Sequence, residues 1–224
     1  MLDDRLQAVA DFVPLTSSVA DIGTDHGYLA IELYKINNQR RVIAADLNAG
    51  PCQAARRTIS EAGFSDSIEV RQGDGLAAIA PGEVDTVCIA GMGGKLEADI
   101  LAARPLVMAQ LKCVVLQPQN GVEYLRAWLY DHHWHIADES LAKVDGRLYQ
   151  IIKAVQGQAE PLTEAELILG PSLIKKRPGL FAEHVQNNLN QLDKIRQGLL
   201  KGGADTRERL GRIEAVIKLL EGFL

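Results

Sequence analysis

The sequence has little cysteine, no long apolar run and no excess of basic residues. Its three cysteines, Cys52, Cys88 and Cys113, are widely spaced and form no pairing typical of a zinc or redox motif, so we expect reduced core residues. No apolar run approaches the roughly 20 residues of a membrane span. The N-terminal residues are too interrupted by charge for a signal peptide, and we expect a cytoplasmic protein with no membrane partner.

Positive charge is also scarce, since 24 basic residues face 29 acidic ones and the net charge is -5. Nucleic-acid binders usually carry a basic balance. The composition therefore argues against nucleic-acid binding unless a local patch exists. Residues 175–177 and 207–212 could supply such a patch, and a solvated helix face explains these segments equally well.

What the sequence does contain is a regular alternation of apolar runs and amphipathic stretches. Its 224 residues, 47% of them hydrophobic, suffice for one α/β domain and an appendage. Runs that are apolar enough to be buried on both faces alternate with helical patterns, which is typical of a doubly wound parallel sheet. We expect strands at residues 18–22, 41–46, 67–71, 86–90 and 112–117, and helices near 27–37, 49–62, 95–103 and 121–132.

Two further strand-like runs, residues 134–141 and 148–155, flank an Asp-Gly pair at Asp145 and Gly146. This pattern predicts an antiparallel hairpin. Five parallel strands closed by such a hairpin form the Rossmann-like sheet of class I methyltransferases. We therefore predict an α/β fold of this kind over residues 1–158.

The pattern changes after the hairpin, where residues 159–224 are predicted to form a helical accessory domain. Thr163 and Glu166 have the spacing of a capping box. Apolar residues recur at three- and four-residue steps over 181–199 and 210–220, with Gly202 and Gly203 between them. This spacing predicts a coiled-coil-like helical hairpin. It can serve as a packing appendage or as an arm that grips the substrate.

Ligands of parallel sheets bind at the carboxyl ends of the strands, so the residues after each strand are the candidates for a site. The first predicted strand leads into Asp21, Gly23, Asp25 and Gly27. A dinucleotide fingerprint would have glycine in place of Asp25. A carboxylate there repels a pyrophosphate but attracts the sulfonium and ammonium of S-adenosylmethionine. The motif therefore favours S-adenosylmethionine over NAD.

The next two strands end in residues that fit the same cofactor. Asp46, followed by Leu47, can accept hydrogen bonds from both ribose hydroxyls, and Asp74 can accept one from the adenine amino group. Gly73 and Gly75 flank Asp74 and leave room for the ring. The alternative interpretation is that these glycines form ordinary turns and the aspartates cap helices.

The fourth and fifth strands lead toward the reacting end of the cofactor. The fourth runs into Ala90 and Gly91 of a glycine-rich turn, with none of the Asp/Asn-Pro-Pro motif found in many amine-modifying nucleobase methyltransferases. The fifth ends in a polar cluster that contains Gln117 and Asn120, whose amides can read the edge of a base.

Three segments, residues 21–28, 90–94 and 117–120, together with the helical tail, resemble the bacterial TrmK family. The resemblance spans nearly the whole chain. It implies a tRNA methyltransferase that modifies N1 of adenine 22 in the D-arm, with tRNA as partner and S-adenosylmethionine as cofactor. Composition and spacing do not supply this substrate.

Methylation of adenine N1 needs no strong base, because the N1 lone pair lies in the ring plane and is unprotonated at neutral pH. The product is cationic, so acceptor groups near the adenine amino group stabilise the developing charge. We predict that Asp25, His26, Gln117 and Asn120 position the base. Asp25 can equally serve only the cofactor. Tyr28 is a candidate stacking partner for a base flipped out of its stem.

Other interpretations stay open at this point. The chain can methylate a small molecule or a protein, or it can be a non-catalytic adaptor that keeps the fold; an NAD-dependent oxidoreductase is more distant. His132, His133 and His135 lie where a helix is expected to end, and histidines there commonly satisfy terminal carbonyls. We predict no metal site. The sequence leaves the oligomeric state open between monomer and dimer.

Overall fold

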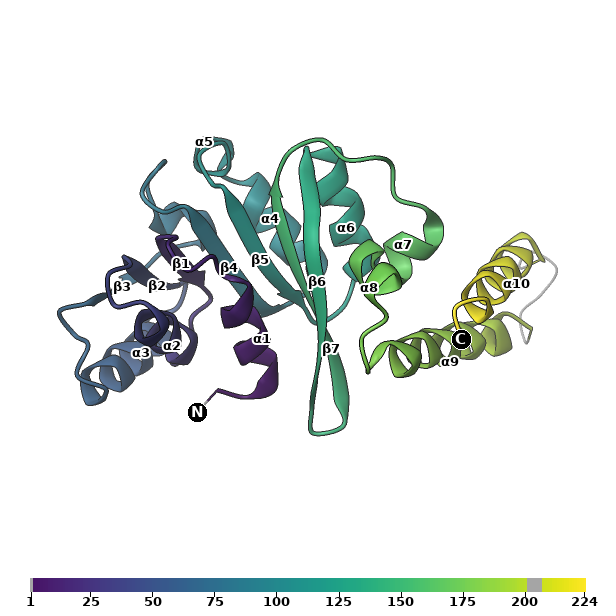
Figure 1. The fold of residues 1–224 in the computed structure, drawn as a ribbon, viewed down its shortest axis with the longest axis horizontal. Helices are drawn as coiled ribbons and strands as arrows, with labels where there is room; N and C mark the ends of the chain where they lie inside the picture. The colour runs from purple at the N-terminus through teal and green to yellow at the C-terminus, as the bar shows by residue number, and fades with distance from the viewer. Residues whose placement is uncertain (1, 201–206) are drawn as a thin grey trace. The chain divides into compact units, whose positions relative to one another are not determined.

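The structure is a computed structural model that describes residues 2–200 and 207–224. The chain forms two compact units, Met1–Ala159 and Glu160–Leu224. Each unit has its own secondary structure, and each is described separately (Figure 1).

The first unit is built on one seven-stranded sheet with the order β3-β2-β1-β4-β5-β7-β6. Strands β1 to β5 pair in parallel, and β7 pairs antiparallel with both β5 and β6. This topology confirms the predicted methyltransferase sheet closed by a hairpin. The strands are β1 Val19–Ile22, β2 Val42–Asp46, β3 Ile68–Gln72, β4 Thr86–Met92, β5 Cys113–Pro118, β6 Trp134–Val144 and β7 Arg147–Gln156.

Helices cover both faces of the sheet (Figure 1). The helices α1, α2 and α3 pack on one face, and α4 and α6 pack on the other. The residues of β1, β2 and β5 are almost all buried, as expected for strands covered on both sides. The helices are α1 Asp4–Phe12, α2 Tyr28–Ile36, α3 Ala49–Glu61, α4 Gly94–Ala102, α5 Pro105–Met108 and α6 Val122–Asp131, with a short 3-10 helix at Gly75–Ala78.

Helix α1 matters for the site because it precedes the sheet in sequence yet packs against its centre and its hairpin. The Asp3 carboxylate caps it by accepting a hydrogen bond from the Leu6 amide at 2.8 Å. Its buried residues Val9 and Ala10 join the core. The alternation of strands and helices in the sequence does not predict which strands α1 packs against.

A buried ion pair fixes α6 against the closing hairpin. Arg126 of α6 donates to Glu139 of β6 at 2.8 Å and to Gln150 of β7 at 2.6 Å. Both charged side chains are fully enclosed. Because an unpaired buried charge is costly, this contact sets the position of the hairpin relative to the helix.

The second unit is helical, as predicted. Thr163 and Glu166 form the expected capping box at the start of α7 (Glu164–Leu169), and α8 (Pro171–Lys176) follows at once. The long helices α9 (Phe181–Leu200) and α10 (Arg207–Glu221) pack against each other. The predicted turn at Gly202 and Gly203 lies outside the described residues.

Candidate active site

The turn after β1 lies at the carboxyl edge of the parallel strands. The Gly23 amide donates to the carbonyl of Ala45 at the end of β2 at 2.8 Å, which ties the two strand ends together. Gly23 has a φ of +80°, and a side chain there would meet the methyl group of Met92. This position therefore favours glycine for its backbone conformation, and it lies close to Met92 at the end of β4.

Asp21 is a buried carboxylate at the base of this turn, with 4% of its surface exposed. The Thr24 hydroxyl donates to it at 2.6 Å. Burial raises the pKa of Asp21 to about 6, the Thr24 hydrogen bond opposes this rise, and the nearby Asp46 charge adds to it. A carboxylate that is this poorly solvated gains most from a cationic ligand.

Asp46 ends β2, and its Oδ1 accepts a hydrogen bond from the Asn48 amide at 2.9 Å. Its carbonyl accepts one from the Gly73 amide, also at 2.9 Å, so the turn after β3 lies beside the end of β2. Leu47 is exposed next to them. Gly75 has a φ of +51°, and a Cβ there would lie 2.8 Å from the Ile100 side chain. The predicted ribose and adenine residues thus occupy adjacent turns.

A cavity of about 380 Å³ lies at this edge. Its volume is within the usual range for cofactor sites. Seven of the predicted site residues line it, together with residues from α1 and from the turns after β1, β4 and β5. The lining residues are Arg5, Leu6, Asp21, Gly23, Thr24, Asp25, His26, Tyr28, Leu29, Asp46, Ala90, Gly91, Met92 and Gln119.

The donor set of this cavity fits S-adenosylmethionine. A methionine ammonium and a sulfonium are cations, and Asp21 supplies a buried anion for them. A ribose has two vicinal hydroxyls, and Asp46 supplies carboxylate oxygens at the end of the neighbouring strand. Gly23 and Gly91 also line the cavity and add no side chains to it.

Asp25 and His26 stand at the mouth of the cavity. Asp25 has a φ of +52°, and its carboxylate lies 3.7 Å from Nε2 of His26. The rings of His26 and Tyr28 stack with centroids 5.8 Å apart. All three side chains are exposed, so they are accessible to an incoming acceptor.

Gln117 and Asn120 do not line the cavity. Gln117 is fully buried at the end of β5, where its Oε1 accepts from Arg5 at 2.7 Å and its amide donates to the Pro118 carbonyl. Asn120 is exposed, and its Oδ1 lies against Gly93. The amide that reaches the cavity from this turn is that of Gln119.

The glycine-rich turn after β4 is built for close packing with the turn after β5. The Gly94 amide donates to the Asn120 carbonyl at 2.8 Å. A side chain on Gly94 would overlap the carbonyl oxygen of Gly121. These contacts place the two turns side by side at the acceptor end of the cavity, next to Gly91 and Gln119.

The structure therefore gathers some predicted residues and separates others. Gly27, Leu47, Gly73, Asp74 and Gly75 lie in the neighbouring turns rather than in the cavity wall. The sequence patterns did not single out Leu6, Leu29, Met92 or Gln119 as site residues. Gln119 belongs to the polar motif at 117–120, so the sequence indicated its segment. Leu6 reaches the cavity only because α1 packs back against the sheet.

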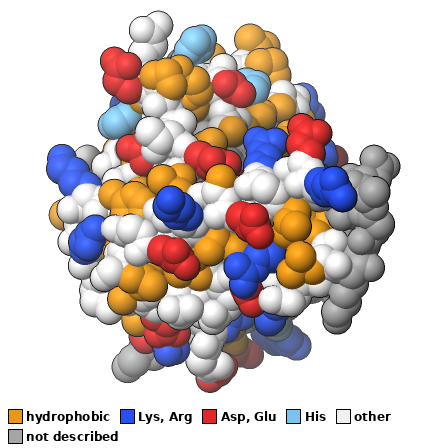
Figure 2. Space-filling model, turned by 90° about the vertical axis from the view of Figure 1, so that its right-hand side faces the viewer, with side chains coloured by type: hydrophobic (Ala, Val, Ile, Leu, Met, Phe, Trp, Pro, Cys, Tyr) orange, Lys and Arg blue, Asp and Glu red, His pale blue; other side chains and the backbone are white. Residues whose placement is uncertain are grey.

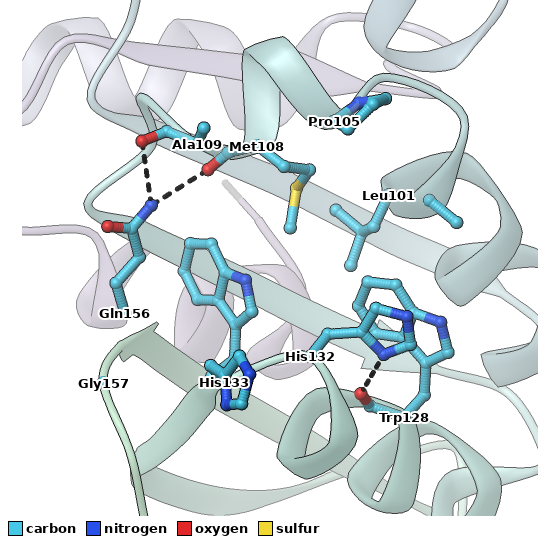
Figure 3. Close-up of a pocket in the computed structure, with 11 residues that line it drawn as sticks. Leu101, Pro105, Met108, Ala109, Trp128, His132, His133, Gln156 and Gly157 are labelled. Atoms are coloured by element: carbon cyan, nitrogen blue, oxygen red, sulfur yellow. Dashed lines mark hydrogen bonds between the residues drawn. The ribbon is translucent and has the colours of Figure 1, made fainter.

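A second hollow of about 450 Å³ lies at the opposite edge of the sheet, where β6 begins and β7 ends (Figure 3). The Gln156 amide donates to the carbonyls of Met108 and Ala109, and the rings of Trp128 and His132 stack 4.0 Å apart. Its lining contains no carboxylate. A cationic cofactor therefore fits the smaller cavity better.

The histidines near this hollow do not build a metal centre. His132 donates from Nδ1 to the carbonyl of Trp128 in the last turn of α6 at 2.8 Å, which is the terminal-carbonyl contact expected for this position. Among the residues that the structure describes, no three His, Cys, Asp or Glu side chains converge as metal ligands.

None of the helices in the described ranges combines the length and the apolar composition that a membrane-spanning segment requires.

Known proteins are similar to this chain in both sequence and fold. Residues 19–222 match the family model TrmK, described as tRNA (adenine(22)-N(1))-methyltransferase. The tRNA (adenine(22)-N(1))-methyltransferase of Bacillus subtilis is 32% identical, and the match covers 98% of this chain and 94% of that protein.

Two solved structures of similar proteins hold the cofactor or its product. Streptococcus pneumoniae Sp1610 in complex with S-adenosyl-L-methionine is 33% identical, with a TM-score of 0.87 over 98% of this chain and 99% of that one. The TrmK of M. capricolum in complex with S-adenosylhomocysteine is 25% identical, with a TM-score of 0.84 over 100% and 97%. Because the family model matches most of this chain and the B. subtilis enzyme is 32% identical to it, the chain belongs to the TrmK family.

Proposed function

We propose that this protein transfers a methyl group from S-adenosylmethionine to N1 of adenine 22 in tRNA. The observation that carries the proposal is the cavity at the carboxyl edge, in which Asp21 and Asp46 stand on adjacent strand ends. Membership of the TrmK family supplies the acceptor. A non-catalytic role is disfavoured because both carboxylates line the cavity. A small-molecule acceptor is disfavoured by the match to the tRNA methyltransferase family.

S-adenosylmethionine supplies an activated methyl group on a sulfonium. We assign Asp21 to the cationic methionine end and Asp46 to the ribose hydroxyls. Gly23 and Gly27 would shape the turn near these carboxylates. Leu47, Gly73, Asp74 and Gly75 would hold the adenine. Ala90 and Gly91 line the end at which the methyl group is presented to the acceptor.

The acceptor residues have to orient a base and accommodate the positive charge that forms on it. Asp25 and His26 stand at the cavity mouth, where a carboxylate stabilises that charge and the imidazole can hydrogen-bond the base edge. Gln119, in the turn after β5, lines the cavity. Gln117 contacts Arg5, and Asn120 contacts Gly93, so neither side chain reaches the cavity. We assign Gln117 and Asn120 a positioning role. The exposed ring of Tyr28 is suited to stack on a flipped base.

We assign the methyltransferase activity to residues 1–158 and an accessory role to the helical residues 159–224. The division into compact units, Met1–Ala159 and Glu160–Leu224, supports this assignment. Because unmodified tRNA is a cytoplasmic substrate, the proposed reaction requires a cytoplasmic enzyme.

The test is incubation of the full chain with labelled S-adenosylmethionine and unmodified bacterial tRNA, followed by nucleoside analysis. We expect 1-methyladenosine from wild-type protein and none from Asp46→Asn. A transcript with guanine in place of adenine 22 is the matched substrate control and should accept no label. Label in another nucleoside, or no transfer despite measurable cofactor binding, would overturn the assigned acceptor.

A further inference from the structure

The closing hairpin extends past the strand beside it on the cofactor side of the sheet. Strand β5 pairs with β7 only over Cys113–Leu116 and Ile152–Val155, whereas β6 and β7 stay paired out to Val144 and Arg147. Figure 1 shows this outer part of the hairpin reaching beyond the neighbouring strand ends, with α1 alongside it. The wall formed by α1 and the hairpin therefore stands next to the cavity.

Two arginines from this wall meet at one aromatic ring. The guanidinium carbon of Arg5 lies 5.7 Å from the ring centroid of Tyr149, and that of Arg147 lies 5.2 Å from it. Both distances are within the range of cation–π contact. Within the part of the chain that the structure describes, Arg147 has no carboxylate partner. The three side chains, here called the Arg5–Tyr149–Arg147 cluster, combine two fixed cations with an aromatic ring.

The buried side-chain amide of Gln117 orients Arg5. Oε1 of Gln117 accepts a hydrogen bond from Nη1 of Arg5 at 2.7 Å, and Gln117 itself is fully enclosed. Asp3 lies 3.7 Å from Nη2 and is partly exposed. A guanidinium carries five N–H donors in a planar fork, so the bond to Gln117 orients the group and leaves donors for a bidentate ligand.

The position of Arg5 relates this cluster to the acceptor end of the cavity. Arg5 lines the cavity, and its Nη1 lies 3.7 Å from the point that a Cβ on Gly91 would occupy. Nε2 of Gln119 lies 3.9 Å from the same point. The cationic cluster thus borders the turn that we assign to the reacting end, on the side away from Asp46.

Charge alone does not identify an RNA surface on this protein. The net charge is -5, and on the face shown in Figure 2 basic and acidic side chains are interspersed. Only a local arrangement of fixed cations can then supply specific phosphate contacts. In the Arg5–Tyr149–Arg147 cluster a buried amide orients the Arg5 guanidinium, and the exposed guanidinium of Arg147 lies against the same aromatic ring.

We propose that the Arg5–Tyr149–Arg147 cluster binds the phosphates that flank the target nucleotide, and thereby presents its base to the cavity. The inference rests on the proposed function and adds the surface that holds the RNA. Arginine binds phosphate oxygens with two parallel hydrogen bonds, and such backbone contacts fix register rather than sequence. Gln117 is a positioning residue that acts through Arg5.

The test compares Arg5→Gln, Arg147→Gln and Gln117→Leu with Arg104→Gln, which replaces an exposed arginine at the other edge of the sheet. Steady-state kinetics with tRNA, direct tRNA binding at several salt concentrations and calorimetric cofactor binding are measured for each. We expect Arg5→Gln and Arg147→Gln each to raise KM for tRNA about tenfold, the effect of about 1.4 kcal/mol. The salt slope of tRNA binding should become shallower by roughly 0.7–0.9 per lost phosphate contact.

Cofactor affinity should stay unchanged in Arg147→Gln and Arg104→Gln, since neither residue lines the cavity. Gln117→Leu should reproduce part of the Arg5→Gln effect on KM, whereas a merely structural role for Gln117 would lower thermal stability and leave the salt slope unaltered. Arg5 and Arg147 variants that bind tRNA with the affinity and salt slope of Arg104→Gln would overturn the inference. Wild-type protein that binds tRNA through these residues but forms no 1-methyladenosine would instead overturn the proposed function.

Discussion

We expect the buried carboxylate of Asp21 to make cofactor affinity depend on pH. In the cofactor-free protein, burial raises the pKa of this group from 3.8 to about 6. A cationic ligand favours the ionised form and lowers the pKa again. Cofactor binding therefore releases a proton when the pH lies between about 4 and 6, and affinity falls as the pH drops through this window.

The magnitude follows from the size of the shift. If the bound cofactor returns the pKa to its ordinary value of 3.8, affinity at pH 5 is about tenfold lower than at pH 7, which corresponds to about 1.4 kcal/mol. The same group acts on stability in the opposite sense. Because the folded carboxyl binds its proton more tightly than the unfolded one, the unfolding free energy of the cofactor-free protein decreases as pH rises from about 4 to 6, by up to about 3 kcal/mol.

The assay is calorimetric titration of S-adenosylmethionine into the protein between pH 5 and 7, in buffers of different ionisation enthalpy so that released protons are counted. The variant Asp21→Asn cannot ionise, so it should bind weakly at every pH and show no proton release. Without cofactor, it should unfold at a higher temperature than wild type at pH 7 and at a similar temperature near pH 4. The control His26→Asn removes the imidazole that also lines the cavity.

Wild-type affinity that is constant between pH 5 and 7 would refute this reasoning. A pH dependence that persists in Asp21→Asn but disappears in His26→Asn would assign the titration to the imidazole and remove the role given to Asp21.

Three further predictions concern the packing that supports the site, and urea unfolding checks each. Arg126→Leu leaves Glu139 buried without its ion-pair partner and should cost about 3–5 kcal/mol, whereas adding Glu139→Leu should recover much of the loss; equal costs for the single and double variants would contradict this. Gly94→Ala should destabilise by about 3 kcal/mol because the new methyl overlaps the Gly121 carbonyl, and an unchanged midpoint would show that the two turns separate freely. Burial without a hydrogen-bond partner raises the pKa of Glu97 well above its ordinary value, so Glu97→Met should stabilise the protein by about 1–3 kcal/mol, and a loss of stability would reveal a partner for this carboxyl.

The alternation of strands and helices and the acidic strand ends could be predicted from local sequence. Apolar runs alternating with helical periodicity specify a parallel sheet, and the Asp-Gly pair at Asp145 and Gly146 specifies the hairpin that closes it. Once a parallel sheet is given, its carboxyl ends share one edge. The convergence of Asp21 and Asp46 on one cavity then follows from topology, because each residue lies near the end of its own strand.

The acceptor side required the tertiary structure. Whether Gln117, Gln119 or Asn120 faces the cavity depends on a turn whose conformation is set by contact with the Gly93–Gly94 turn of another strand. Arg5 and Gln117 are 112 residues apart, and no periodicity connects them. Sequence by itself determined the fold class and the position of Asp21 and Asp46 at adjacent strand ends, since these depend on local pattern. The tertiary structure decided which other side chains line the cavity, because long-range packing of α1, the hairpin and the two glycine turns brings them together.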